Sequence, residues 1–105
     1  MSTKRLAFLE KLVADGSRDA FHHYALALEY SSLGRVDDAV AAFTTLRDVI
    51  DAAYVPTYLM CGSLLAKAGR TADARTWLEQ GIGAAQRKGD QHALSELQSA
   101  LAALE

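Results

Sequence analysis

The sequence predicts an all-α protein of about six helices, and three observations support this fold class. Four glycines stand directly after stretches with helical periodicity, where a left-handed residue can end a helix: Gly16, Gly34, Gly69 and Gly89. Pro56 is the only proline in 105 residues, which favours long regular elements over loops. No segment sustains the two-residue alternation of apolar and polar side chains that is typical of strands, so a sheet is not expected.

The first two helices are expected on either side of Gly16. The first spans about residues 3–14, because its leucines recur at helical spacing on one stripe. The second is expected to run to Leu33. Its N-terminal cap is assigned to Ser17, and Asp19 is well placed against the positive end of the helix.

The third and fourth helices are predicted from charge and proline placement. The third begins near Val36, carries two aspartates in its first turn and ends near Ile50. These aspartates, at positions 37 and 38, are better explained as helix-start residues than as an acid–base pair. Pro56 suits the first turn of the fourth helix, where its missing N–H costs nothing.

The last two helices follow Gly69 and Gly89. Thr71 can cap the fifth helix, which ends near Lys88, and Asp90 can cap the sixth. In the sixth helix, leucines recur at spacings of three and four residues, which indicates one buried stripe: Leu94, Leu97, Leu101 and Leu104. Two glycines inside the fifth helix, Gly81 and Gly83, each cost helix stability relative to alanine. A close helix approach is one explanation for Gly83, and poor local order is another.

Charge and composition narrow the classes of function. The chain carries 11 basic and 13 acidic residues, a net charge of −2, with no basic stripe for a phosphate backbone. No apolar run approaches the ~20 residues that span a bilayer, and no signal-peptide core is recognisable. A single cysteine, Cys61, cannot form an internal disulfide. We therefore expect a cytoplasmic protein that binds neither nucleic acid nor membranes.

The central helices repeat at an interval of 35 residues. Residues 33–39 align with residues 68–74 and share Gly, Arg, Asp and Ala at equivalent positions. Further pairs match at the same interval: Phe43 with Leu78, Leu26-Ala27 with Cys61-Gly62, Tyr30 with Leu65, and His23 with Tyr58. The small residues at these positions let paired helices cross closely, and the large ones fill the space beside each crossing.

This helix–turn–helix unit resembles the tetratricopeptide repeat, whose 34 residues follow the pattern W-x2-L-G-x2-Y…A-x3-F…P. The first copy reads His23-x2-Leu26-Ala27-x2-Tyr30, then Ala39-x3-Phe43, and the second reads Tyr58-x2-Cys61-Gly62-x2-Leu65, then Ala74-x3-Leu78. The usual Trp is replaced in both copies, and Pro56 lies a few residues late. The resemblance covers about residues 20–88 and implies antiparallel helix pairs stacked as a right-handed superhelix.

The resemblance also implies the organisation of the chain as one domain of residues 1–105. A capping helix (3–15) precedes the first repeat (18–52), and a second repeat (55–88) is followed by a C-terminal capping helix (90–104). Two repeats are fewer than a solenoid normally needs, so the flanking helices are expected to contribute to the core. A plain helical bundle, which would have the same helices but no groove, is the alternative fold.

Catalytic or metal-binding residues are not indicated. His22 and His23 are adjacent on a helix, so their rings diverge by about 100° and cannot readily chelate one metal. Cys61 falls at a core position without an activating neighbour, and no phosphate loop or nucleophile motif is present. Arg35 and Arg70 are expected to bond helix-end carbonyls or to pair with the nearby Asp38 and Asp73. Trp77 is expected to pack against the last helix; an exposed ring would mark a contact surface.

In the tetratricopeptide repeat family, the first helix of each repeat lines a concave groove that binds partner proteins. Carried onto this sequence, the partner-binding residues are Phe21, Tyr24, Leu28, Ser31, Leu59, Ser63 and Lys67, with Ser32, Pro56 and Ala66 beside them. The Lys/Asn cluster with which family members clamp C-terminal carboxylates is missing. The groove therefore suits an apolar peptide or an amphipathic helix. In a competing interpretation, the chain's own N-terminal helix covers Phe21 and Tyr24.

The functional expectation is a non-catalytic adaptor or scaffold, without cofactor, that binds another protein or peptide. Two alternatives use other chemistry. In the first, the same apolar surface seals a homodimer; in the second, the chain is a small metal-binding protein or enzyme. Concentration-dependent mass would favour the first alternative, and stoichiometric zinc in purified protein would favour the second.

Overall fold

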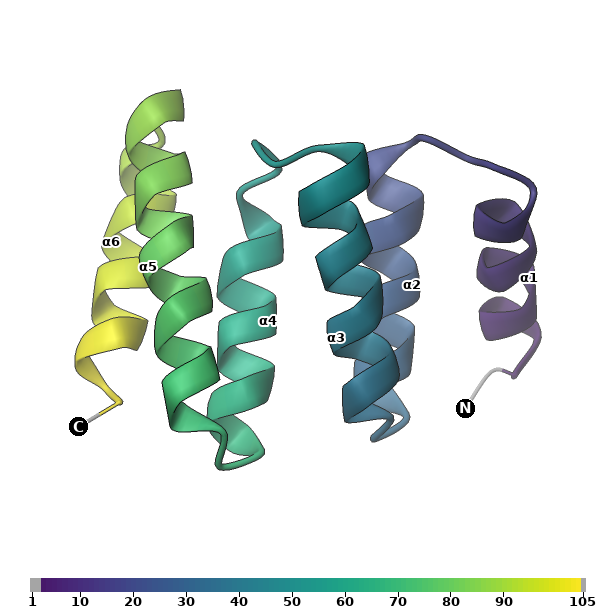
Figure 1. The fold of residues 1–105 in the computed structure, drawn as a ribbon, viewed down its shortest axis with the longest axis horizontal. Helices are drawn as coiled ribbons and strands as arrows, with labels where there is room; N and C mark the ends of the chain where they lie inside the picture. Colours follow the sequence, from purple (N-terminus) through teal and green to yellow (C-terminus); the bar gives the residue numbers. More distant parts are fainter. Residues whose placement is uncertain (1–2, 105) are drawn as a thin grey trace. The chain divides into compact units, whose positions relative to one another are not determined.

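The computed structural model describes residues 3–104, and this range is helical without a strand (Figure 1). It forms two compact units, one ending at Asp51 and the other beginning at Ala52. The helices are α1 (Thr3–Ala14), α2 (Ala20–Ser32), α3 (Val36–Thr45), α4 (Pro56–Lys67), α5 (Thr71–Lys88) and α6 (Gln91–Ala102), with a π-helical turn, η1 (Leu46–Ile50), directly after α3. The predicted all-α class is confirmed.

The first unit is built on the antiparallel pair α2 and α3 (Figure 1). The chain reverses at Gly34, whose φ of 76° is the left-handed conformation that favours glycine. Ala27 and Ala39 are fully buried, as is Phe43, so small side chains at the crossing let the two helices approach. This is the role that the repeat pattern predicted for these positions.

The α1 helix also belongs to the first unit and packs against α2. Leu6 and Leu9 of α1 form a buried cluster with Leu26 of α2. Partly buried side chains surround this cluster: Leu12, Val13, Ala25, Tyr30 and Leu33. The N-terminal helix therefore contributes to the core, as expected of a capping helix.

The second unit repeats the pairing with α4 and α5, which reverse at Gly69 with a φ of 79°. A Cβ atom on Gly62 would lie 2.6 Å from Cδ2 of Leu78, so a larger residue at this helix crossing would require the buried Leu78 side chain to shift. The α6 helix then packs against both α5 and α4. Gly81 of α5 lies at this junction, where an added Cβ would lie 2.8 Å from Cδ2 of Leu97.

Two of the three predicted N-terminal caps are wrong. The side chain of Asp19, and not that of Ser17, caps α2, because its Oδ1 accepts a hydrogen bond of 2.9 Å from the Phe21 N–H. Thr71 is the first residue of α5 and makes no capping bond; Arg70 precedes it. Asp90 caps α6 as predicted, accepting from the Ala93 N–H at 3.0 Å.

The third predicted helix ends at Ile50 as expected, but its last five residues are π-helical. The Asp51 N–H bonds to the Leu46 carbonyl at 2.8 Å, the five-residue spacing of a π-helix. Arg18 donates to the Val49 carbonyl at 2.9 Å and satisfies an acceptor at this helix end. A π turn holds one residue more than an α turn, and over five residues at a helix end the apolar pattern is too short to distinguish the two.

Gly83 has space around it. An added Cβ would meet a single neighbour within 4 Å, the guanidinium of Arg87 at 3.3 Å, which is the far end of a flexible side chain. The close helix approach considered for Gly83 is therefore absent. Of the helices in residues 3–104, none is long and apolar enough to cross a membrane.

Candidate partner-binding surface

Phe21 lies in the first turn of α2, and its side chain is 61% exposed. The α1 leucines pack instead against other α2 side chains, among them Leu26 and Tyr30. The N-terminal helix therefore does not cover Phe21. Tyr24, one turn further along α2, is half-buried, and its ring lies 6.4 Å from the ring of Phe43 on α3 in a tilted arrangement.

The four α2 residues of the predicted surface form one stripe. Their spacings of three, four and three residues place Phe21, Tyr24, Leu28 and Ser31 on one helix face. Leu28 and Ser31 are half-buried, like Tyr24. The stripe is thus apolar over three positions, ends on a hydroxyl, and is most open at Phe21. We refer to these four residues as the α2 stripe.

On α4, the predicted residues Ser63 and Lys67 line a recess of about 260 Å³. Its other lining residues come from α4, α5, α6 and the two residues directly after α6: Gly62, Ala66, Leu78, Ala100, Ala103 and Leu104. Leu59 lies one turn before Ser63 and is half-buried. We refer to this hollow as the α4–α6 recess; it is mainly apolar, with Lys67 as its one basic side chain.

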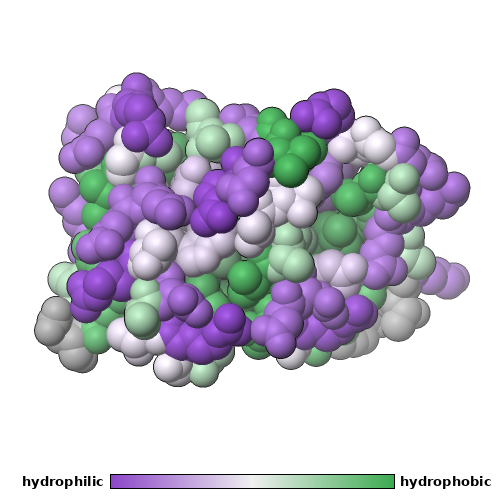
Figure 2. Space-filling view, in the orientation of Figure 1, coloured by the Kyte–Doolittle hydropathy of each residue, from purple (hydrophilic) through white to green (hydrophobic). Residues whose placement is uncertain are grey.

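The contribution of α6 to this recess was missed at the sequence level. Ala100 lies in α6, and Ala103 and Leu104 follow its last residue; this whole segment was assigned only a capping role. The local sequence signal is a pair of small residues three positions apart, Ala100 and Ala103. Small side chains allow a close contact but do not indicate which helix they contact. The predicted residues on α2 share one helix face, and so do those on α4. That both sets line a single groove stays a prediction. Figure 2 shows apolar areas interrupted by hydrophilic side chains on the face in view.

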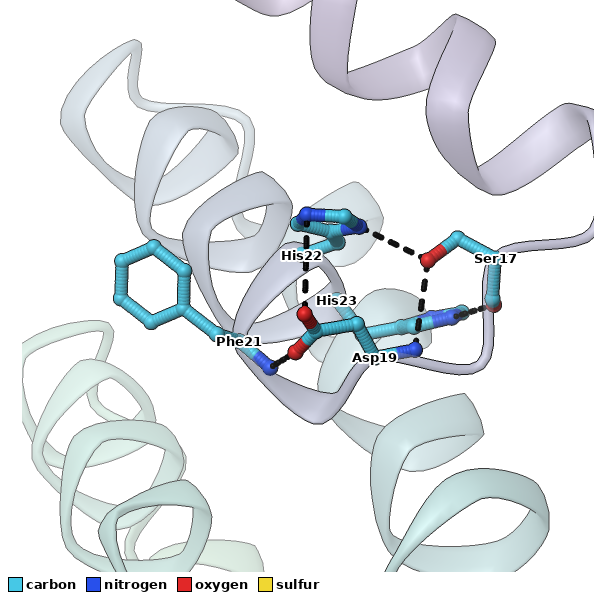
Figure 3. A network of polar contacts seen from close by, with 5 residues as sticks. All are labelled: Ser17, Asp19, Phe21, His22 and His23. Carbon is cyan, nitrogen blue, oxygen red and sulfur yellow. Dashed lines mark hydrogen bonds and ion pairs between the residues drawn. The ribbon is translucent and has the colours of Figure 1, made fainter.

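A network of polar contacts surrounds the start of α2 (Figure 3). The Ser17 hydroxyl lies 2.7 Å from Nδ1 of His22 and accepts a bond of 3.2 Å from the Asp19 N–H. Nε2 of His22 is 3.7 Å from a carboxylate oxygen of Asp19, beyond hydrogen-bond distance. These contacts join residues within Ser17–His22 and organise the N-terminus of α2.

The two adjacent histidines point to different atoms. Nε2 of His23 donates to the Ser17 carbonyl at 2.7 Å, whereas His22 contacts the Ser17 hydroxyl (Figure 3). His23, at the aromatic position of the repeat pattern, is 4% exposed. Within residues 3–104, no three His, Cys, Asp or Glu side chains gather where they could hold a metal ion.

The remaining candidate residues have structural neighbours. Cys61 is buried, as predicted. Trp77 is 7% exposed, and its ring lies 6.2 Å from the ring of Tyr58 on α4, so it does not mark a contact surface. The two turn arginines pair with aspartates three residues later, as expected: Arg35 with Asp38 at 2.8 Å, and Arg70 with Asp73 at 3.6 Å.

The comparisons with known proteins agree with this architecture. No protein-family model and no curated protein matches the chain. A crystal structure and a solution NMR structure of a tetratricopeptide repeat domain protein from Salinibacter ruber are each 40% identical to it. The crystal structure matches with a TM-score of 0.74, over 82% of this chain and 94% of the other. The NMR structure matches with a TM-score of 0.77, over 83% and 87%.

A protein from Bordetella parapertussis, solved in solution, is 30% identical and matches with a TM-score of 0.81. That match covers 99% of this chain and 89% of the other. It therefore extends over the flanking helices as well as the two central helix pairs. The family of the chain follows from these similarities, and the paired helices and repeated glycine turns agree with it. The chain belongs to the tetratricopeptide repeat family.

Proposed function

We propose that this chain is a non-catalytic module that binds an apolar peptide or an amphipathic helix of another protein. The proposed contact residues are the α2 stripe, together with Leu59, Ser63 and Lys67 on α4. Membership of the tetratricopeptide repeat family supports a role in protein interaction in general. The polar clusters described above organise helix ends, so the proposal assigns no catalytic residue.

One observation carries the proposal: the 61% exposure of the Phe21 side chain. A large apolar side chain left open to water is a favourable anchor for a partner, because binding removes its surface from water. The packing of α1 on other α2 side chains leaves Phe21 available. Tyr24 and Leu28 continue the apolar stripe. A partner helix would contact it through apolar side chains of its own at three- and four-residue spacings.

The α4–α6 recess supports a second contact. Its walls are mainly apolar and suit one branched apolar side chain, and Lys67 favours an acidic residue close to that anchor. A short surface of this kind is expected to bind with a dissociation constant of about a micromolar. The homodimer is the competing occupant of the same surface.

The test compares two phenylalanines with the same exposure. Phe21→Ala removes the proposed anchor, and Phe8→Ala is the matched control, since Phe8 lies on α1 and is 63% exposed. Proteins captured from a lysate by the original chain should be lost with Phe21→Ala and retained with Phe8→Ala. Equal retention by both variants would show that the α2 stripe is not the binding site.

A charge variant tests the second contact. Lys67→Glu should weaken capture of the same partner. Lys4→Glu, at a lysine of α1 that is also exposed, should leave it unchanged. Circular dichroism of all four variants checks that the helices are intact. If the chain captures only copies of itself, and its mass in solution rises with concentration, the homodimer replaces the hetero-partner.

A further inference from the structure

The second unit contains a recess of about 280 Å³ between the segment that precedes α4 and the C-terminal half of α5. Five residues line it: Ala52, Ala53, Ala84, Arg87 and Lys88. We refer to it as the α5 recess. It shares no residue with the α2 stripe or with the proposed contacts on α4, so its occupancy does not depend on the proposed function.

Two cations and no carboxylate line the α5 recess. Nζ of Lys88 donates to the Ala53 carbonyl at 3.2 Å, which ties the last turn of α5 to the segment before α4 and keeps this charge beside the recess. Arg87 makes no hydrogen bond or ion pair with any residue of 3–104. A guanidinium has five N–H donors, so those of Arg87 are available to an anionic occupant.

Gly83 is a second observation that concerns Arg87. A glycine inside a helix costs about 1 kcal/mol relative to alanine, and no packed neighbour requires a glycine at this position. The one heavy atom within 4 Å of an added Cβ is Nη1 of Arg87, at 3.3 Å, which is closer than ordinary van der Waals contact. The Arg87 side chain therefore turns back along α5 over Gly83, and the missing Cβ leaves room for the guanidinium in this position.

We propose that the α5 recess binds the side-chain carboxylate of a glutamate from a partner protein, held by the guanidinium of Arg87 with Nζ of Lys88 close by. A guanidinium and a carboxylate pair through two parallel hydrogen bonds. The three alanines form apolar walls for the methylene groups of glutamate, which a bare phosphate lacks. Sites for drug-sized ligands occupy about 300–1,000 Å³, so a recess of about 280 Å³ suits one side chain. Membership of a family of protein-interaction modules supports a protein as its source.

The probe for this site is N-acetyl-glutamate α-amide, whose single charge is the side-chain carboxylate. Titrated into the ¹⁵N-labelled full chain, it should shift the amide signals of Ala53, Ala84 and Lys88 in a saturable way, with a dissociation constant of about 10 mM. The Nε signal of Arg87 should move with the same dependence. N-acetyl-glutamine α-amide has the same shape without the charge and should bind about fivefold more weakly.

Two substitutions in α5 provide the second test. Arg87→Gln should weaken the glutamate probe about fivefold, and Arg75→Gln, at an arginine in the first half of the same helix, is the matched control and should leave binding unchanged. Gly83→Ala should displace the guanidinium and weaken the probe about twofold, although it removes no charge. Unchanged binding in Gly83→Ala would overturn the role assigned to this glycine.

The proposal is overturned if no saturable shift occurs at the α5 recess, if the two probes bind equally well, or if Arg87→Gln and Arg75→Gln bind alike. Arg87 is exposed and makes no contact that the fold requires, so Arg87→Gln should fold, which circular dichroism checks. If it does not fold, the two probes on the original chain decide. Because the probe acts on α5 and the segment before α4, its failure leaves the proposed partner site untouched.

Discussion

The phenol of Tyr30 donates a hydrogen bond of 2.6 Å to the carboxylate of Glu10, a residue 20 positions earlier in the chain. This bond joins α1 to α2 beside the leucine cluster formed by Leu6, Leu9 and Leu26. On the other side of the ring, the guanidinium of Arg35 lies 4.7 Å from the ring centroid. Tyr30 therefore connects α1 with the turn that leads into α3, through three kinds of contact.

The titration of Tyr30 provides the first prediction. Burial of the phenol and the hydrogen bond to Glu10 raise the pKa of Tyr30 to about 12. A pKa above the unfolded value near 10 means that this stabilisation is complete below pH 10. It is lost as the pH rises from about 10 to 12. In a spectrophotometric tyrosinate titration, Tyr30→Phe should remove absorbance change from the high-pH end of the curve.

The same substitution tests the strength of the contact at neutral pH. Tyr30→Phe should lower the free energy of unfolding by about 1 kcal/mol, because a partly buried hydrogen bond to a carboxylate is lost. Urea denaturation at pH 7 measures this. Glu10→Gln keeps a hydrogen-bond acceptor and should cost less. Equal stability of Tyr30→Phe and the original protein at both pH 7 and pH 11 would contradict the role assigned to this bond.

Two glycines in α5 should respond in opposite ways to the same substitution. A Cβ on Gly81 would lie 2.5 Å from Cβ of Tyr58, close to the backbone of α4, so Gly81→Ala should destabilise by about 1–3 kcal/mol. Gly83 meets only the flexible end of Arg87. Gly83→Ala should therefore stabilise by up to about 1 kcal/mol, through helix propensity alone. Thermal unfolding of the two variants is the measurement, and a shift of the same sign in both would refute this explanation.

The N-terminal cap of α2 can be tested at Asp19. Asp19→Ala removes the acceptor of the Phe21 N–H and should cost about 1 kcal/mol of stability. Asp19→Asn is the matched control, because asparagine caps a helix about as well as aspartate does. Urea midpoints of the two variants separate the lost hydrogen bond from the lost charge. A cost that is as large with Asn as with Ala would mean that charge, and not capping, determines the effect.

Thr57 is a buried residue whose hydroxyl has no hydrogen-bond partner among residues 3–104. Thr57→Val keeps the branched shape and removes this unsatisfied hydroxyl, so it should stabilise the protein by about 1 kcal/mol. Thr76→Val is the control: Thr76 is exposed, its hydroxyl bonds to the Ala72 carbonyl at 3.3 Å, and its change should stay within about 0.5 kcal/mol. A loss of stability in Thr57→Val, measured by thermal unfolding, would indicate that the hydroxyl has a partner.

The start of α2 illustrates how far local reasoning extends. Ser17 and Asp19 are both good capping residues, and their sequence positions allow either one. In the structure α2 begins at Ala20, so Asp19 is the residue at its N-terminal cap, and the Ser17 hydroxyl contacts His22 instead. The choice depends on the residue at which the helix begins, and helical periodicity does not determine that to within two residues.

The candidate site was predictable only in part, for a similar reason. The resemblance to the tetratricopeptide repeat family singled out Phe21, Tyr24, Leu28 and Ser31, and the structure has them on one face of α2. Whether α1 covers Phe21 depends on which α2 side chains the α1 leucines contact, and leucine contacts are not directional. The α6 side of the α4–α6 recess was missed for the same reason, since small residues such as Ala100 and Ala103 carry no local signal of their neighbour.

The sequence by itself determined six helices, four left-handed glycine turns and two copies of one helix pair. The helices and turns follow from backbone geometry and from side-chain spacing within about one or two turns of helix, and the two copies follow from the 35-residue repeat. Only the tertiary structure decided the contacts between distant residues, such as Tyr30 with Glu10, the closeness of Gly81 to Tyr58, and the exposure of Phe21. Those contacts depend on how packed helices are turned about their own axes, which periodicity leaves open.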